Sequence, residues 1–368
     1  MKKTDAGSKA GVDASTEALT PAGWRTHDCL AVGDLVLAMD PVEKQIHWRR
    51  VARVARTRWD STADGPLIRW GHRSVGALTA PAHPWLQLND MGRKLGDDRP
   101  HAWTTTRELD GREWVRLVFG GGRPRCFANS SPISSEFAEL LGWIVTEGCF
   151  PKPKKGSGNW VMVCQSERVN PEKTERLRQL AAHFRGLGFT FNEHRRKPDG
   201  VVPFYIGVDL GALIRAALPD KQLPAALICS LTHDQARILY EALMAGDGHV
   251  RKDGSQCFLQ LDQGRIDSFQ MLAAMLGSRT AQKTWDALNG VFRITVYTRD
   301  FGTSGSNHPT AEDYAGFIWY PEFDRASAWL ARRERTTFWT GAPAPIGAPS
   351  PRSVGAGDWS STTQDALF

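Results

Sequence analysis

The sequence lacks several features that would assign it to a simple class. No apolar run approaches the roughly 18 residues that a membrane span needs, and the N-terminal segment MKKTDAGSKAGVDAST has no apolar core of a signal peptide. The six cysteines are scattered without C-x-x-C spacing, which argues against a disulfide framework and a structural zinc site. These absences predict a cytoplasmic protein with reduced thiols.

Charge is present but unevenly spread. The 368-residue chain is long enough for two domains and carries a formal net charge of +6, which suits a polyanionic partner. Residues 149–200 contain eleven Lys and Arg against five Asp and Glu, whereas residues 201–300 contain ten of each. The candidate phosphate contacts in the runs PKPKK and EHRRK are Lys152, Lys154, Lys155, Arg195, Arg196 and Lys197. The alternative interpretation of these basic runs is a solvated surface that binds no phosphate.

Composition divides the chain into four parts. Residues 1–15 and 342–368 are rich in small and polar residues, and we expect both tails to be disordered. Residues 16–125 contain short strand-like runs bounded by Gly and Pro, such as DLVLAMD and GPLIRWG, and predict an all-β domain. Within residues 134–305, helices and strands alternate in an order that occurs twice, which predicts two lobes at about 134–228 and 229–305.

Two of the predicted helices, 137–148 and 234–247, end in an acid. The apolar pattern of FAELLGWIVTEG leads to Glu147, and that of ILYEALMAGDG leads to Asp247. Each is followed by a strand, a second helix (170–188 or 265–278) and further strands, which predicts a pseudo-twofold axis. If the two helices pack side by side at this axis, the small residues Gly142, Ala242 and Ala245 let their backbones come close.

Two carboxylates at one axis repel each other unless a cation lies between them. Mg²⁺, or Mn²⁺ in its place, suits such a pair, because Mg²⁺ binds through one or two carboxylates plus waters and substrate phosphates. Paired metals can activate water and stabilise the leaving oxygen in phosphodiester hydrolysis. We therefore predict that Glu147 and Asp247 are catalytic, metal-binding residues. Double-stranded DNA, itself close to twofold symmetric, would offer one phosphodiester to each carboxylate.

The segments LLGWIVTEG and YEALMAGDG resemble the two copies of the motif that names the LAGLIDADG homing endonucleases. The resemblance covers about residues 134–300 and implies an α+β fold of two αββαββα lobes in one monomer. It also implies β-ribbons laid into the DNA major groove, a staggered double-strand cut, and polar or basic side chains around the scissile phosphates. The candidates for these side chains are Gln165, Gln260, Lys283 and Lys197, with Arg293 as a further DNA contact. The alternative interpretation of Gln165 and Gln260 is that each is an outward-facing strand residue.

The flanks resemble the Hint domain of inteins and Hedgehog proteins. LTPAGWRTHDCLAVGDLVLAMD is similar to the start of that β domain, and FIWYPEFDRASAWLARRERTTFWTG is similar to its last strands. LTAPAHPWLQL is similar to its Thr/His block, with Thr79 and His83 in the roles that polarise a peptide bond. This implies a Hint-like β domain of residues 16–125 plus 315–341, with the endonuclease inserted in it.

The sequence departs from the splicing pattern where the chemistry lies. No Cys precedes Leu19, and Ala342 and Pro343 stand where the family has its terminal Asn and the next nucleophile. Neither residue has the reacting side chain that splicing needs. We therefore interpret the Hint-like domain as splicing-inactive, with Thr79 and His83 as packing and turn residues. Two alternatives stay open: an intein with residual splicing activity, and a non-cleaving DNA- or RNA-binding relative.

Overall fold

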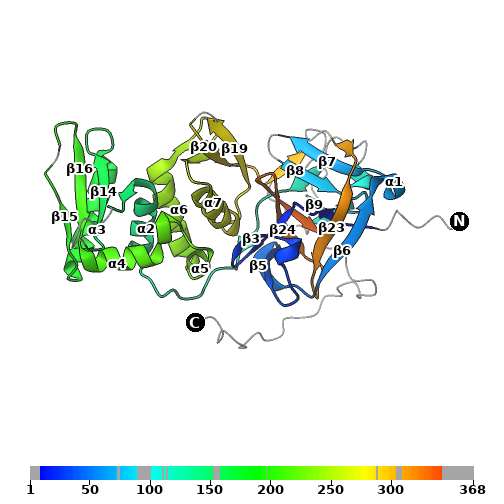
Figure 1. Ribbon diagram of the computed structural model, residues 1–368, viewed down its shortest axis with the longest axis horizontal. Helices are drawn as coiled ribbons and strands as arrows, with labels where there is room; N and C mark the ends of the chain where they lie inside the picture. Colours follow the sequence, from blue (N-terminus) through cyan, green and yellow to red (C-terminus); the bar gives the residue numbers. More distant parts are fainter. Residues whose placement is uncertain are drawn as a thin grey trace.

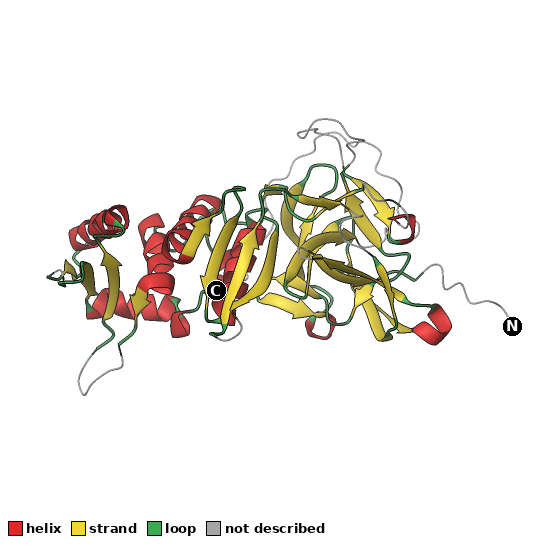
Figure 2. Ribbon diagram, turned by 90° about the horizontal axis from the view of Figure 1, so that it is seen from above, coloured by secondary structure: helices red, strands yellow, loops and turns green. Residues whose placement is uncertain are grey.

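The structure is a computed structural model that describes residues 9–72, 75–88, 101–109, 112, 115–151, 158–195, 197–286, 289–303 and 309–341. The molecule is elongated, with most helices at one end and a strand-rich part at the other (Figures 1 and 2). The described chain contains seven α-helices and extensive sheets, so the prediction of an α+β fold is confirmed. None of these helices has the length and apolar character needed to cross a bilayer.

The predicted helices correspond to α2, α3, α6 and α7. Helix α4 was not predicted, because only Gly207 separates it from the preceding strand, and the two read as one run. The helices are α1 (Ser61–Asp64), α2 (Ser135–Glu147), α3 (Pro171–Gly186), α4 (Val208–Ala217), α5 (Ala225–Cys229), α6 (His233–Asp247) and α7 (Gln263–Met275), with 3-10 turns η1 (His27–Cys29), η2 (Arg107–Leu109) and η3 (Pro219–Lys221).

Capping residues explain where the long helices begin. The Ser134 hydroxyl accepts a hydrogen bond from the backbone of α2, and Thr232 forms a capping box with Gln235 at the start of α6. Asp262 caps α7 in the same way as Ser134 caps α2. Pro171 occupies the first position of α3, where its missing N–H costs no hydrogen bond.

Two segments share one succession of elements. Lobe one (residues 134–221) contains α2, a strand pair, α3, a second strand pair and α4, and lobe two (residues 233–300) repeats this order through its last strand. The strand order β13-β14-β16-β15 of lobe one matches the order β17-β18-β20-β19 of lobe two. These strands are β13 (Gly148–Cys149), β14 (Val161–Ser166), β15 (Phe191–Glu193), β16 (Val201–Ile206), β17 (Gly248–Val250), β18 (Gln256–Gln260), β19 (Thr280–Asp286) and β20 (Val291–Val296).

The remaining strands form the β part (residues 9–126 and 301–341). One of its sheets has the described order β22-β7-β8-β1-β23-β6. Its strands are β1 (Val12–Asp13), β6 (Arg53–Asp60), β7 (Leu67–His72), β8 (Val75–Thr79), β22 (Thr310–Glu312) and β23 (Ala315–Glu322).

The second sheet of the β part is continuous with the sheet of lobe two, because β25 pairs with β19. Strand β21 pairs with β11, so residues 301–303 belong to the β part although lobe two was predicted to extend to residue 305. The strands that the β part contributes are β2 (Glu17–Thr20), β3 (Gly23–Thr26), β4 (Leu35–Met39), β5 (Gln45–Arg50), β9 (Pro84–Gln87), β10 (Ala102–Thr105), β11 (Arg116–Val118), β12 (Arg123–Pro124), β21 (Phe301–Thr303), β24 (Ala328–Arg333) and β25 (Thr336–Gly341).

The prediction of a disordered tail over residues 1–15 is wrong for residues 9–15. Strand β1 lies between β8 and β23, with Val12 opposite Thr79 on one side and Trp319 on the other. Asp13 is buried and bonds to Arg333 at 2.8 Å, so long-range pairing orders a segment whose local composition suggested disorder. Residues 1–8 and 342–368, the rest of the predicted tails, lie outside the described residues.

Helices α2 and α6 pack side by side through small residues. A Cβ added at Gly142 would lie 2.6 Å from the Cβ of Ala242, so only glycine permits this approach. Gly246 is pressed against the Thr146 side chain in the same way. The predicted close approach at Gly142 and Ala242 therefore exists, and Ala242 and Ala245 also border a groove beside the contact. This packing brings the last turns of both helices together.

Candidate active site

The two predicted acids occupy equivalent places. Glu147 is the last residue of α2 and Asp247 the last of α6, and in each case the next residue begins a strand. A Cβ at Gly148 or Gly248 would lie 2.5 Å from a carbonyl oxygen of the preceding turn. Each acid is thus followed by the one residue type that lets the chain leave the helix at this angle.

Burial sets the pKa of both acids, and the charge of Asp247 also acts on Glu147. Burial raises the pKa of Glu147, and the neighbouring charge of Asp247 raises it further. Burial also raises the pKa of Asp247. Both groups are only partly enclosed, so they are desolvated but remain reachable. A carboxylate pair of this kind is held in its charged form only if cations offset the repulsion and the lost hydration.

Each acid has a glutamine near it on the second strand after its helix, Gln165 on β14 and Gln260 on β18. The Gln260 amide donates to Asp247 at 2.5 Å. The Gln165 amide lies close enough to Glu147 to lower its pKa, but its buried Nε2 has no well-formed hydrogen bond within the described residues. Both glutamines are buried, at 4% and 8% exposure, so the outward-facing alternative is wrong for both.

The cations that act most strongly on the two acids were not predicted from the sequence. The Nζ of Lys221 donates to the carbonyl oxygen of Gly148 at 2.5 Å, and its charge lowers the pKa of both acids. Lys173 acts on both acids as well, and Arg265 acts on Asp247 and bonds to Gln260 at 3.3 Å. Burial, followed by the charge of Arg265, lowers the pKa of Lys221.

The chain reaches Lys221 through an unusual turn. Asp220 and Lys221 have φ angles of 52° and 58°, in the left-handed region that non-glycine residues rarely adopt. This places the lysine at the acid pair although it lies 26 residues before Asp247. The only local signal is the Pro-Asp turn at residues 219–220, and a turn alone does not indicate a site.

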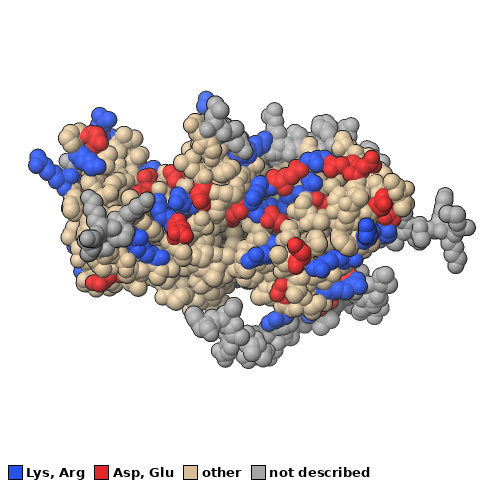
Figure 3. Space-filling view, in the orientation of Figure 1, with Lys and Arg blue, Asp and Glu red and all other residues tan. Residues whose placement is uncertain are grey.

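The predicted basic residues lie elsewhere. Lys283 on β19 stands opposite Arg293 on β20, and neither is among the strongest influences on the acids. Arg195 and Lys197 are exposed at the turn between β15 and β16. Burial raises the pKa of Cys164, and the charge of Lys197 offsets part of this rise. Lys and Arg side chains gather at the outer end of this ribbon in Figure 3. The candidates outside the described residues are Lys152, Lys154, Lys155 and Arg196.

The residues at the acid pair suit Mg²⁺ or Mn²⁺ better than they suit a metal whose ligands all come from the protein. Within the described ranges, no cluster of three or more His, Cys, Asp or Glu could hold an ion by itself. Mg²⁺ needs only one or two carboxylates when waters and phosphates complete its coordination, whereas structural zinc needs four protein ligands. The Gln165 Nε2 has no hydrogen-bond partner among the described residues and is a further N–H donor near Glu147.

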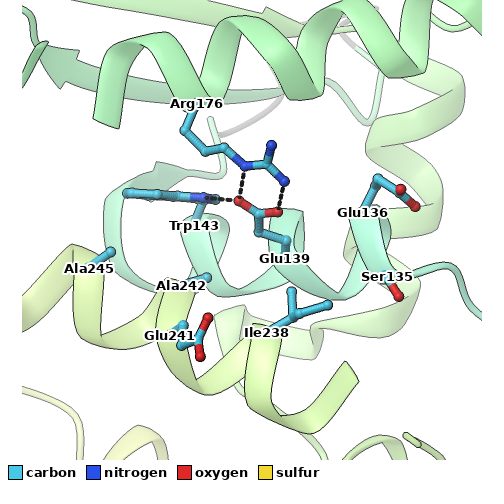
Figure 4. Close-up of a pocket in the computed structure, with 9 residues that line it drawn as sticks. All are labelled: Ser135, Glu136, Glu139, Trp143, Arg176, Ile238, Glu241, Ala242 and Ala245. Atoms are coloured by element: carbon cyan, nitrogen blue, oxygen red, sulfur yellow. Dashed lines mark hydrogen bonds and ion pairs between the residues drawn. The ribbon is translucent and has the colours of Figure 1, made fainter. Parts of the chain in front are cut away.

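A groove of about 400 Å³ lies between α2, α3 and α6 and does not include the acid pair (Figure 4). Its main polar feature is an ion pair in which two nitrogens of the Arg176 guanidinium bond to Glu139, at 2.7 and 2.5 Å. Trp143 also donates to Glu139, at 3.4 Å. These bonds satisfy the buried Glu139 carboxylate and hold α3 against α2, so these polar side chains of the groove stabilise the packing of the two helices.

The β part brings Thr79 and His83 into one buried network. Burial lowers the pKa of His83 to about 3, its Nε2 bonds to the Thr340 hydroxyl, and its Nδ1 has no partner among the described residues. Thr79 bonds to Thr106 at 3.0 Å, and the Thr106 backbone N–H donates to the His83 carbonyl at 2.9 Å. Thr79 and His83 are therefore linked through Thr106.

Comparison with solved structures finds similarity to the homing endonuclease I-DmoI. A mesophilic variant of I-DmoI is 16% identical over 45% of this chain and 90% of that chain, with a TM-score of 0.36. I-DmoI in complex with DNA and Mn is 16% identical, and the match covers 45% of this chain and 91% of that chain. I-DmoI in complex with DNA and Ca is 18% identical, and the match covers 45% of this chain and 84% of that chain. Both have a TM-score of 0.36. No family model matches the chain, and no curated protein matches it. A TM-score of 0.36 is too low to assign the fold, so the geometry of the site stands on its own.

Proposed function

We propose that the chain is a site-specific double-stranded DNA endonuclease of the homing type, which hydrolyses phosphodiester bonds with Mg²⁺ or Mn²⁺. The observation that carries this proposal is the pair of desolvated carboxylates, Glu147 and Asp247, at the ends of two adjacent helices, surrounded by Lys221, Lys173 and Arg265. A site with acids for a divalent cation and positive charge for a phosphate suits phosphoryl chemistry.

In this proposal the two lobes are related by a pseudo-twofold axis that passes between α2 and α6. The matching strand orders of the two lobes and the contact between Gly142 and Ala242 support it. Each lobe would present one β-ribbon to a DNA half-site. Lys283 and Arg293 lie on the ribbon of lobe two, and Arg195 and Lys197 lie on the ribbon of lobe one.

The roles of the side chains follow from their chemistry. Glu147 and Asp247 would hold the divalent cation, which when bound activates water and stabilises the leaving oxygen. The Lys221 ammonium would stabilise negative charge that develops at the phosphate, and its lowered pKa would help it to give up a proton to the leaving oxygen. Gln165 would orient a water through its Nε2, while Gln260 holds Asp247 in place.

The β part, in this proposal, is a Hint-like domain without splicing activity. Its last strands pair with its first, since β24 pairs with β2 and β4, and β25 pairs with β9. A His83 whose pKa is about 3 remains neutral and enclosed, as a packing residue does. Placed between two reporter domains, residues 9–341 should yield no ligated reporters by mass spectrometry, and a ligated product would instead show residual splicing.

A cleavage screen tests the nuclease proposal. The full chain would be incubated with a randomised duplex DNA library with and without Mg²⁺, and cut ends would be sequenced. We expect staggered double-strand cuts at a restricted set of sequences, only with the metal. Binding without cutting would favour the non-cleaving relative, and neither binding nor cutting would contradict the proposal.

A further inference from the structure

The two lobes differ in how their sheets end. The described strands of lobe one pair only with each other, in a four-stranded sheet. In lobe two, the outermost strand β19 pairs onward with β25 of the β part, with Ala281 opposite Thr336, and the Gln282 N–H donates to the Arg335 carbonyl at 3.0 Å. The β19–β20 ribbon lies beside α7, on the side of lobe two that faces the β part (Figure 1).

Buried hydroxyl groups reinforce this junction. The Thr337 Oγ1 accepts the backbone N–H of Thr280 at 3.2 Å and donates to the Thr280 carbonyl at 3.1 Å. The two threonine hydroxyls also bond to each other, at 3.0 Å, and the Gln270 amide of α7 donates to the Thr280 hydroxyl at 3.1 Å. All three side chains are fully buried, so removing the Thr337 hydroxyl would take away the acceptor of the Thr280 N–H without giving water access to it.

Ionic contacts join the same two bodies. Arg332 of β24 and Arg335 of the turn between β24 and β25 both bond to Asp267 of α7, at 2.7 and 2.8 Å. Arg332 is almost completely buried, also bonds to Glu17 at 2.7 Å, and lies over the Trp24 ring at 4.4 Å. Glu334 and Arg335 have the positive φ angles of a tight hairpin turn, which holds both arginines at this position.

The ion pairs described for Arg176 and Arg178 of lobe one connect elements of the same lobe. Arg178 bonds to Glu167 and Glu193 at 2.6 and 2.8 Å, and Arg176 bonds to Glu139. The sheet and the helix α7 of lobe two are therefore supported partly by residues of the β part. The described sheet of lobe one is supported by contacts within lobe one.

We propose that the β part serves lobe two as a structural partner that fixes the orientation of the β19–β20 ribbon. Resting on the proposed function, the ligand is one half-site of a duplex DNA, read by the Lys283 and Arg293 side of a ribbon that β25 holds. Lobe one reads the other half-site with a ribbon that it orients alone. A β domain without splicing chemistry thus has a function that keeps it in the chain.

Hydrogen exchange of the full-length protein tests the structural half without DNA. In Thr337→Val, the amides of β19 and β20 should exchange roughly tenfold faster, which corresponds to about 1.4 kcal/mol, while those of β14 and β16 keep their rates. The matched control is Thr79→Val, a buried strand threonine of the β part whose hydroxyl bonds to Thr106 of the same part. Unchanged β19 and β20 rates, or equal acceleration in both lobes or in both variants, would overturn the proposal.

A milder pair of variants covers the case in which Thr337→Val does not fold. Arg335→Gln removes a half-exposed cation that joins the β part to lobe two, and Arg178→Gln removes one that lies within lobe one. The first variant should speed exchange in β19 and β20, and the second should speed it only in lobe one. The reverse pattern, or no difference between the two variants, contradicts the proposal.

Selection from randomised duplex DNA tests the recognition half. Sequences bound by the wild type should show base preferences in two half-sites, and sequences bound by Thr337→Val should lose the preference in one half only. Equal loss in both halves, or none, would overturn this assignment. If the wild type selects no sequence at all, the proposed function fails, whereas the exchange result still decides the structural partnership.

Discussion

The acid pair of the helical lobes and the His83 network of the β part are both polar, but they are built in opposite ways. Glu147 and Asp247 are partly enclosed, repel each other and lie within reach of the charges of Lys221 and Lys173. His83 is fully buried and neutral, and Thr340 satisfies its Nε2. The first arrangement leaves charge and donors available to a ligand, and the second uses its polar groups internally. This difference agrees with the proposed roles of the two sites.

The largest effect should come from neutralising the acids. Glu147→Gln or Asp247→Asn should lower the DNA cleavage rate by about a thousandfold or more, because each removes a metal-binding charge while preserving the size of the side chain. DNA binding, measured by fluorescence anisotropy, should change little. Cleavage near the wild-type rate by either variant would remove the acid pair from the mechanism.

The same two variants also test whether the charged acids destabilise the fold. A carboxylate whose folded pKa is raised favours the proton in the folded state, so its charged form destabilises the fold once the pH exceeds the unfolded pKa. At neutral pH and without metal, the two variants should therefore melt at the same temperature as the wild type or higher. A lower melting temperature would show that the acids stabilise the fold.

Lys221→Met should have the next largest effect, a decrease in cleavage rate of about a hundredfold, because it removes the cation whose Nζ bonds at the end of α2. The pH dependence of the remaining activity should also change, which a purely structural role would not produce. Arg237→Gln, an exposed substitution on α6 next to Glu241, is the matched control and should retain full activity.

His83 should control stability rather than cleavage. Its folded pKa of about 3 lies below the unfolded value of 6.5, so its contribution is complete above pH 6.5 and is lost as the pH falls from 6.5 to about 3. The slope from this residue should be about 1.4 kcal/mol per pH unit. In denaturant titrations, His83→Gln should flatten that part of the curve, and an unchanged slope would show that His83 titrates normally.

The smallest effect should come from the exposed ribbon of lobe one. Replacing Arg195 and Lys197 with Ala should weaken DNA binding similarly for all sequences. The salt dependence should fall by somewhat under one unit of slope for each phosphate that the protein no longer neutralises. Binding isotherms at several salt concentrations measure this. An unchanged slope would show that Arg195 and Lys197 belong to a solvated surface and do not contact phosphates.

Local sequence patterns predicted the elements that carry the acids. The apolar periodicity of α2 and α6 indicates where each helix runs, and the glycine after each acid marks where it ends, whereas the caps Ser134 and Thr232 were identified only in the structure. Helix α3, with Pro171 at its first position, followed from the same rules. These features depend on residues within a few turns, so one sequence is sufficient to find them.

Tertiary structure decided what surrounds the acids. Lys221 reaches the pair only through a left-handed turn, and the inward direction of Gln165 and Gln260 depends on strand register. The order of residues 9–15 and the pairing of β19 with β25 depend on partners far away in sequence. The sequence by itself determined the acids and their helices, because hydrophobic period and capping are local. The cations, the glutamines and the joined sheet were decided by long-range pairing, which no local pattern encodes.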